Sequence, residues 1–522
     1  MVKVNLDALI PREDFEISDK TTSGNKKDTI SIEDMKLKSF FITNVRKPDF
    51  QRETNEWEPE KVVEFVESFI NGDLIPAIIL WRSPTGYLFV IDGSHRLSSH
   101  RLSSLIAWIN DDYGDGIASK TFYDGVIDED QKEIAKRTRD LIEKKVGEYE
   151  DYKLALTNPD KVKSEIQRLS KNLGALAIQL QWVEGDVSKA EDSFFKINQQ
   201  AAPINKTELV LLKARKKPSC IAARAIMKSG KGHKYWSSFS DEKQKEIQEL
   251  AVEINKVLFS PRLETPLKTL DIPLCGKISS AQTLPLILGF VNISNGIYDN
   301  EEIHSLNDDS DGSETVKFLK ETRKIAQRIN SNECFSLGLH PVIYFYSKTG
   351  RHKPASFLGI VELVKELETK KKFDDFIEVR KDFETILDKY DFVVQQINRR
   401  FRYAKKSIKP LLLFYMTIID NLKSGKSIEE SVKETLKLKD FENVNIDNEY
   451  FESRGNEFSQ PVKNLAFIKT YLKSAPRCPI CRGFIHKNSI SFDHIVRKED
   501  GGKGTSDNAQ LTHPYCNSTY KN

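Results

Sequence analysis

The sequence predicts an α+β region at the amino terminus, an all-α middle region and a small zinc-bound module at the carboxyl terminus. Three observations lead to this fold class. Strand patterns alternate with helix patterns up to residue 217, amphipathic helix patterns dominate residues 218–470, and cysteine and histidine pairs gather in residues 471–522. A chain of 522 residues is also too long for one hydrophobic core. We therefore expect a lead-in arm at 1–40, an α+β domain at 41–217, a helical connector at 218–470 and the module at 471–522.

The composition is that of a globular protein with a charged surface. Hydrophobic residues make up 39% of the chain and charged residues 30%, and the net charge is only +3. A charge this small excludes a binder that is basic throughout, so any nucleic-acid surface must be a local patch. No early segment resembles an export signal, and apolar runs such as LLLFYMTII (411–419) are too short to cross a bilayer. We expect a cytoplasmic protein without membrane association.

Residues 1–40 are polar, and TTSGNKKDT breaks any early element, which predicts an irregular arm. After Pro59, apolar residues recur at helical spacing and predict a helix over 59–70. The apolar runs AIILWR (77–82) and YLFVID (87–92), joined by SPTG, predict a β-hairpin.

Helical spacing then returns from Ser94, and residues 121–172 are charged and helical. The run ALAIQLQWV (175–183) predicts a further strand, followed by a helix that carries FFKINQQAAPINKTEL (194–209). This alternation of strands and helices is the basis of the α+β prediction for the first domain.

Two short motifs near the end of the chain have the spacing of zinc ligands. Cys478 and Cys481 are separated by two residues, and His513 and Cys516 repeat that spacing. Three thiolates and one imidazole fill a tetrahedral shell, which predicts a closed structural zinc site. The metal would supply much of the folding free energy of so small a module. His486 is an alternative ligand, although it lacks a paired partner.

Between these motifs lies SFDHIVRKEDGGKGTSDNAQL (491–511), and a Cys-Asn pair follows the second motif. This pattern resembles the HNH (ββα-metal) endonuclease family. The resemblance implies that His494 is the general base and that Asp493 and Asn517 hold a catalytic Mg²⁺ or Mn²⁺. It further implies that Asn508 orients the histidine. This chemistry suits hydrolysis of a phosphodiester, which needs an activated water and stabilisation of the leaving oxygen.

The stretch VIDGSHRLSS (90–99) places Asp92, Gly93, Ser94, His95 and Arg96 where a strand gives way to a helix. Free first-turn amides and the helix dipole favour a phosphate there. Gly93 allows close approach and Arg96 can bind two phosphate oxygens. The alternative is that Asp92 or Ser94 caps the helix and Arg96 is solvated. His95 is either a hydrolytic or nucleotide-contacting residue or simply lies near the cap.

PDFQRETNEW (48–57), the hairpin, VIDGSHRLSS and FFKINQQAAPINKTEL occur in this order along the chain. Together they resemble ParB-like domains with a DGQQR or DGQHR motif, which recur in bacterial anti-phage and DNA-modification systems. The resemblance implies that Gln51, Arg52 and Asn198 line the phosphate pocket of the Asp-Gly-Ser-His-Arg turn. It makes a nucleoside triphosphate a candidate ligand, with NTPase activity as a further expectation. Ser94 departs from the family's glutamine and leaves the nucleotide open.

The helical region contains INRRFRYAKKSIK (397–409), in which basic residues alternate with aromatic ones. Such a stretch favours contact with a DNA backbone. The alternative is a solvated helix face. The candidate DNA-binding residues are Arg399, Arg400, Arg402, Lys405 and Lys406.

These features predict a bacterial defence nuclease that resembles a restriction enzyme. Its ParB-like domain would sense a nucleotide or modified DNA, and this state would control an HNH domain that nicks or cuts DNA. Phage or modified DNA is the expected partner, and a homo-oligomer is left open. One alternative is a ParB-type DNA-binding regulator whose zinc module only binds DNA. Another is an ungated nicking enzyme in which the N-terminal domain recognises DNA.

Overall fold

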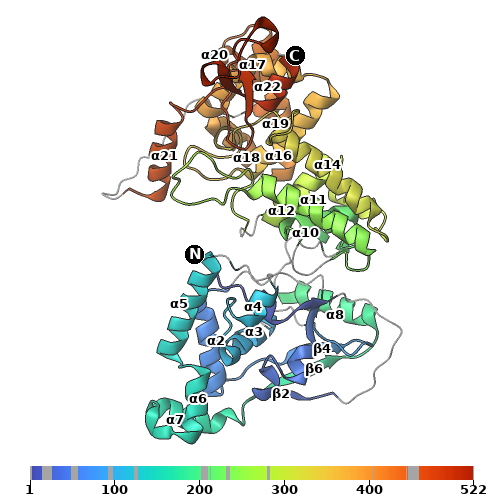
Figure 1. Ribbon diagram of the computed structural model, residues 1–522. Helices are drawn as coiled ribbons and strands as arrows, with labels where there is room; N and C mark the ends of the chain where they lie inside the picture. Colours follow the sequence, from blue (N-terminus) through green and yellow to red (C-terminus); the bar gives the residue numbers. More distant parts are fainter. Residues whose placement is uncertain are drawn as a thin grey trace. The chain divides into compact units, whose positions relative to one another are not determined.

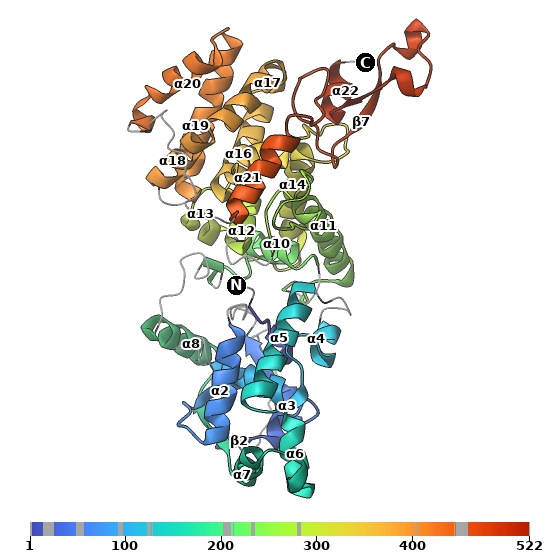
Figure 2. The same cartoon turned by 90° about the vertical axis from the view of Figure 1, so that its left-hand side faces the viewer.

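A computed structural model describes residues 3–13, 26–48, 57–91, 98–122, 127, 129–201, 210–211, 213–230, 235–278, 283–401, 404–442, 444 and 458–520. The chain divides into two compact units (Figures 1 and 2). Unit 1 comprises residues 1–215 with 231–235, and unit 2 comprises residues 216–230 with 236–522. The α+β region and the helical region predicted from the sequence lie in different units, and the predicted zinc module lies in unit 2.

Unit 1 contains a mixed sheet in the order β1-β3-β5-β4-β6-β2. The β4–β5 pair is antiparallel and forms the predicted hairpin, whereas β3 pairs with β5 and β4 pairs with β6 in parallel. The strands are β1 (Arg12–Glu13), β2 (Thr29–Ser31), β3 (Val45–Pro48), β4 (Ile78–Arg82), β5 (Leu88–Val90) and β6 (Ala177–Val183).

Helices cover both faces of this sheet. Unit 1 contains the α-helices α1 (Phe40–Asn44), α2 (Pro59–Asn71), α3 (Ser98–Asn110), α4 (Ile117–Phe122), α5 (Glu129–Lys145), α6 (Tyr149–Thr157), α7 (Ser164–Leu173) and α8 (Val187–Ala201). Short 3₁₀ turns occur at η1 (Asp7–Leu9), η2 (Glu33–Met35) and η3 (Pro159–Lys161).

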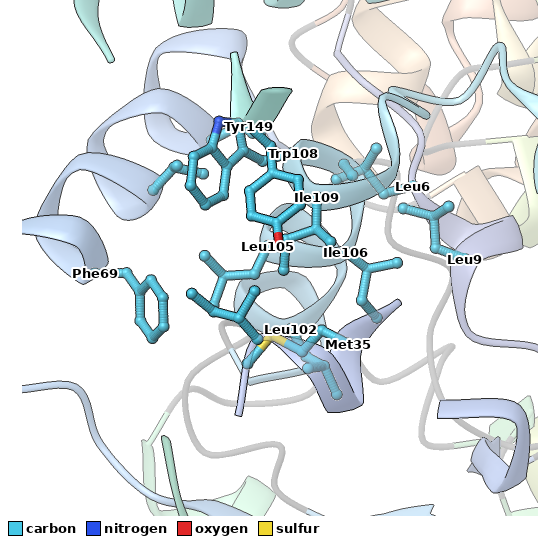
Figure 3. Packing of buried hydrophobic residues seen from close by; sticks show 14 of the residues in the cluster. Leu6, Leu9, Met35, Phe69, Leu102, Leu105, Ile106, Trp108, Ile109 and Tyr149 are labelled. Carbon is cyan, nitrogen blue, oxygen red and sulfur yellow. The ribbon is translucent and has the colours of Figure 1, made fainter. Parts of the chain in front are cut away.

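Strand alternation decides which core each side chain joins. Leu80 and Val90 face the larger core, which α2, α3, α5 and α6 also line. Their neighbours Trp81 and Phe89 face the opposite side, where Ala190 and Phe194 of α8 cover them. Figure 3 shows the larger core, in which side chains of α3 gather with residues from several other elements.

The predicted irregular arm at 1–40 is more ordered than the sequence indicated. Its described residues include β1, which pairs with β3, and β2, which pairs with β6. Leu6, Leu9 and Met35 are buried in the larger core (Figure 3). The physical reason is that short two- and three-residue strands carry too few side chains for a period-two pattern to stand out from a polar background.

Unit 2 is helical up to residue 471, as predicted. Its α-helices in this range are α10 (Pro218–Met227), α11 (Asp241–Phe259), α12 (Thr283–Ser294), α13 (Asn300–Ser305), α14 (Ser313–Ile329), α15 (Pro341–Tyr344), α16 (Pro354–Thr369), α17 (Phe373–Lys389), α18 (Asp391–Phe401), α19 (Ala404–Lys423), α20 (Ile428–Leu436) and α21 (Gln460–Tyr471), with a 3₁₀ turn η4 (Lys439–Phe441). The run LLLFYMTII lies within α19 and supplies buried residues. None of the helices in the described part of the chain combines the length and apolarity needed to span a membrane.

The carboxyl-terminal module has the predicted ββα order. Strands β7 (Ser491–His494) and β8 (Ala509–Thr512) form an antiparallel hairpin, and helix α22 (Pro514–Tyr520) packs on β7. The hairpin connection contains the 3₁₀ turns η5 (Lys498–Asp500) and η6 (Ser506–Asn508). The module contacts the loop between α14 and α15. The carbonyl oxygen of Ser336 in this loop accepts a hydrogen bond from the Tyr515 amide at 3.0 Å, and the Ser336 hydroxyl lies 3.0 Å from the Ser489 hydroxyl.

Candidate metal centre and active site

The four predicted zinc ligands come together in the structure. One ligand atom each from Cys478, Cys481, His513 and Cys516 lies within 4.8 Å of all the others, and all four residues are buried. The Cys481 sulfur lies 3.2 Å from Nδ1 of His513, and the Cys516 sulfur lies 4.0 Å from it. The first pair sits on the turn before β7, and the second pair brackets the start of α22. The centre thus joins the two ends of the module.

The protonation of this cluster favours a cation. Hydrogen bonds from Cys481 and Cys516 hold the pKa of the Cys478 thiol well below its usual range. The pKa of Cys516 shifts in the opposite direction, because it shares hydrogen bonds with Cys478 and Cys481. Three thiols this close cannot all ionise unless a positive ion joins them, since like charges at short range repel. Zn²⁺ would satisfy all three, and the donor set therefore fits this metal.

The orientation of His513 also fits a metal ligand. Its Nε2 lies 3.0 Å from the carbonyl oxygen of Phe484, so the N–H of this nitrogen donates to that carbonyl. The proton on Nε2 leaves the lone pair of Nδ1 facing the thiols. A histidine ligand usually has its second ring nitrogen fixed in this way. Phe484 is therefore the backbone partner that sets the tautomer.

His486, the alternative ligand, lies outside the cluster. It is 1% exposed, and its Nδ1 lies 3.2 Å from the side-chain oxygen of Asn330 on the helical side. Its Nε2 lies 3.7 Å from a carboxylate oxygen of Asp271. Burial lowers the pKa of His486 to about 4, against the raising effect of Asp271. His486 is thus a neutral histidine in the contact between the module and the helices.

The β7–β8 hairpin carries the residues predicted to act in catalysis. Asp493 is buried opposite Gln510, whose side-chain amide donates to its carboxylate at 2.9 Å. His494 is half-buried and is the last residue of β7, where the chain leaves the strand. Phe492, two residues earlier on the strand, is 73% exposed. The carboxylate is thus held inside the module, and the histidine lies beside an open surface.

Asn508 fixes the chain just after His494. Its side-chain oxygen accepts from the Val496 amide at 2.7 Å, and its Nδ2 donates to the carbonyls of Val496 at 3.1 Å and Lys503 at 2.9 Å. The backbone carbonyl of Asn508 also accepts from the Ile495 amide at 2.9 Å. These bonds close the loop that follows His494, so Asn508 can position the histidine through the backbone.

Asn517 lies on α22 where this helix packs against β7. Its Nδ2 donates to the Ser491 hydroxyl at 2.7 Å and approaches the Phe492 carbonyl at 3.4 Å. Ser491 and Asp493 share one face of the strand, so Asn517 lies on the face that carries Asp493. Two hard oxygen donors from adjacent elements fit a Mg²⁺ or Mn²⁺ ion.

Most of the predicted phosphate pocket falls outside the described residues, namely Gln51, Arg52, Asp92, Gly93, Ser94, His95 and Arg96. The described flanks are strand β5, which ends at Val90, and helix α3, which begins at Ser98. The predicted change from strand to helix is thus present on either side of the motif. Asn198 lies in α8.

The basic stretch of the helical region lies where α18 ends and α19 begins. Arg399 and Arg400 are exposed on α18, and Lys406 is exposed on α19. Lys405 belongs to α19, and Arg402 is outside the described residues. The guanidinium of Arg400 donates to the Glu442 carbonyl. Figure 2 shows α18 and α19 in a different part of unit 2 from β7 and α22, so this stretch is not part of the hairpin surface.

Sequence analysis missed the residues of the helical region that contact the metal centre. Arg380 and Glu384 of α17 are both fully buried, and Arg380 Nη1 lies 3.3 Å from His513 Nδ1. The sequence around them is that of an ordinary amphipathic helix with many charges. Only their i,i+4 spacing could have drawn attention to them, and that spacing is common on solvated helix faces.

Comparisons with known proteins agree with this picture at both ends of the chain. Residues 33–215 match the family model described as the N-terminal domain of the GmrSD restriction endonuclease, and residues 478–522 match that of the HNH endonuclease. No curated protein and no solved structure gave a significant match. The two family matches confirm the resemblances to an N-terminal domain of anti-phage systems and to an HNH endonuclease that the sequence indicated. They support a restriction-like DNA endonuclease.

Proposed function

We propose that this chain, which joins the N-terminal domain of the GmrSD restriction endonucleases to an HNH endonuclease domain, is a gated nuclease of bacterial defence. Its N-terminal domain would sense a nucleotide or modified DNA and thereby control cleavage of phage DNA by the module. The observation that carries the proposal is the module itself. A buried Cys₃His cluster holds together a hairpin that presents His494 beside an exposed surface.

The proposed chemistry uses residues of the hairpin and of α22. His494 takes a proton from a water molecule, whose oxygen then forms a bond to phosphorus as the phosphodiester bond breaks. Asp493 and Asn517 would hold a divalent cation, which supplies stabilisation of the negative charge on the leaving oxygen. Asn508 keeps the loop after His494 closed, so the imidazole stays in position for proton transfer.

The sensing part of the proposal is supported by how unit 1 arranges the flanks of the three predicted pocket segments. Strands β3 and β5 are parallel neighbours with Arg46 opposite Phe89, so their carboxyl ends lie side by side. Ile197, which precedes Asn198 on α8, packs in the small core together with Phe89 and Ile91. The carboxyl ends of β3 and β5 are thus neighbours, and α8 packs against the core that contains Phe89 and Ile91. Ligand sites of open sheets lie at such carboxyl ends.

We extend the proposal to the ligand and the setting. The N-terminal domain binds a nucleoside triphosphate or a DNA phosphate through Gly93 and Arg96, and nucleotide hydrolysis there would involve His95. The protein would act in the cytoplasm on phage or modified DNA. Arg399, Arg400 and Lys406 form an additional exposed basic surface for the DNA backbone.

The proposal is tested by incubating the purified chain with modified and unmodified phage DNA, with Mg²⁺ or Mn²⁺ and with each nucleotide in turn. Cleavage that depends on a divalent metal and on one of these nucleotides or modifications is expected. Absence of cleavage under every combination would contradict the nuclease assignment. Retention of phage protection by a His494→Ala variant would instead favour the ParB-type regulator whose zinc module only binds DNA.

Gating is tested separately with Arg96→Ala, because this substitution removes the guanidinium proposed to bind phosphate. The expected result is loss of the nucleotide or modification dependence, with zinc content unchanged. Arg168→Ala, on the exposed face of α7, is the matched control. If Arg96→Ala keeps both the regulated cleavage and the phage protection of the unmodified chain, control through this turn is wrong.

A further inference from the structure

A buried ion pair of the helical region lies directly beside the metal centre. Arg380 and Glu384 stand one turn apart on α17, both with 0% exposure, and Arg380 Nε donates to Glu384 Oε1 at 2.8 Å. Burying two charges is costly unless their remaining hydrogen-bonding groups are also satisfied. The hydrogen-bond partners of those groups therefore indicate the role of the ion pair.

The remaining groups of the pair hold two segments around the centre. Arg380 Nη1 donates to the Leu337 carbonyl at 2.6 Å, and Nη2 donates to the Gly338 carbonyl at 3.0 Å. Glu384 Oε2 accepts a hydrogen bond from the amide of Phe484 at 2.8 Å, and Phe484 lies two residues before His486. Phe484 is also the residue whose carbonyl fixes the His513 ring. One ion pair thus holds the loop before α15 and the first zinc-ligand turn.

The contact between the pair and the module leaves no room for a side chain. A Cβ atom at Gly483 would lie 2.3 Å from Arg380 Nε and 2.9 Å from Glu384 Oε1. A Cβ atom at Gly338 would lie 2.6 Å from the His513 ring, and the φ of Gly338 is +61°. Glycine at both positions lets the two backbones approach the ion pair and the histidine ligand.

A buried positive charge of the helical region lies beside the charged centre. A Zn²⁺ ion bound by three thiolates and a neutral imidazole carries one net negative charge. Arg380 supplies a buried positive charge 3.3 Å from a ligand nitrogen. Arg477 Nη1 lies 3.9 Å from Oε2 of Glu384, so this carboxylate has a positive charge near each of its oxygens.

We propose that Arg380 is a positioning residue and counter-ion of the zinc centre, so that the nuclease module retains its metal only while α17 of the helical region is docked against it. The inference goes beyond the proposed function, because it concerns metal retention and stands whether or not the chain cleaves DNA. It also makes α17 the element through which the helical region can influence Asn517, since His513 lies at the start of the helix that carries it.

The test uses the full chain and measures zinc loss to a chelator together with the absorption spectrum of the Co²⁺-substituted protein. Arg380→Met keeps the length of the side chain and removes its charge. It should release zinc roughly ten- to one hundred-fold faster than the unmodified chain, the range typical of partners that contact metal ligands. It should also shift the thiolate-to-cobalt charge-transfer band. Lys381→Met removes the same charge from the exposed neighbouring position and should change neither measurement.

Unchanged zinc release and an unchanged cobalt spectrum in folded Arg380→Met would overturn the proposal. If that variant does not fold, Gly483→Ala decides, because it keeps every charge and only forces the module away from Arg380 and Glu384. Faster zinc loss from Gly483→Ala supports the proposal, and a rate equal to that of the unmodified chain refutes it. If the variants lose zinc faster, as expected, but the unmodified chain cleaves no DNA, then only the nuclease function is disproved.

Discussion

The metal centre and the β7–β8 hairpin belong to one small module, yet they are built in opposite ways. Cys478, His513 and Cys516 are fully buried, and Arg380 of the helical region lies 3.3 Å from Nδ1 of His513. On the hairpin, Phe492 is 73% exposed and Ile495 is 54% exposed, on either side of His494. The comparison teaches that the module takes its stability from the side that faces the helices and keeps the other side open for a substrate.

The largest expected effect comes from breaking the buried side. Cys516→Ser removes one thiolate and should lower zinc affinity more than about 100-fold, because the thiolate contributes directly to a site whose binding energy is also folding energy. Zinc content and thermal unfolding of the purified chain measure this effect. Cys334→Ser is the control, since that cysteine is exposed and lies outside the cluster. Equal zinc content in both variants would show that Cys516 is not a ligand.

A second substitution should impair the hairpin side of the module and leave the metal centre unchanged. Asp493→Asn keeps a side chain of the same size and can still accept a hydrogen bond from Gln510, but it weakens the proposed divalent-cation site. Cleavage should fall at least about 100-fold, because a catalytic metal contributes several kcal/mol to the transition state. Zinc content should not change. A Mg²⁺ titration of cleavage checks this, with exposed Asp507→Asn as the control. Normal cleavage by Asp493→Asn would remove this residue from the site.

A smaller effect is expected from the loop that follows His494. Asn508→Asp replaces the donor to the Val496 and Lys503 carbonyls with a carboxylate oxygen, which repels both. The loss of these bonds should destabilise the hairpin by about 1 kcal/mol. Cleavage should fall while zinc content stays constant. Hydrogen exchange of the Ile495 amide, which donates to the Asn508 carbonyl, measures the loosening, and Ser506→Ala in the same turn serves as the control. Unchanged exchange would contradict the role given to Asn508.

A separate effect concerns pH and the histidine in the contact with the helices. Burial holds the pKa of His486 at about 4, below its ordinary 6.5, so the unfolded chain binds more protons between these values. Stability is therefore present above about pH 6.5 and is lost as the pH falls toward 4. From pH 7 to pH 5 this single group should cost about 2 kcal/mol. His486→Gln should lack this component when denaturant unfolding is compared at both pH values. An equal loss in both proteins would contradict a neutral His486.

The sequence predicted those parts of the site whose residues are close together in the chain. Cys478 with Cys481, and His513 with Cys516, have a spacing that metal geometry itself imposes, and the pattern around Asp493 and His494 lies between them. The hairpin of unit 1 and the helix that begins at Pro59 were likewise predictable, because each depends on local periodicity.

The missed features depend on contacts between distant residues. Arg380 lies about a hundred residues before the zinc motifs, and a charged residue in an amphipathic helix gives no sign that it will be buried. Strands β1 and β2 were missed because their partners, β3 and β6, determine them more than their own short sequences do.

The central claim, a metal-dependent nuclease with His494 as its base, is tested most directly by one comparison. Purified wild-type chain and His494→Ala, with equal zinc content and equal melting temperature, are incubated with supercoiled phage DNA and Mn²⁺ under the conditions that activate the wild type. The account predicts that the wild type nicks or cuts the DNA and that the variant is slower by about 100-fold or more while still binding it. Equal cleavage by the two proteins would contradict the account.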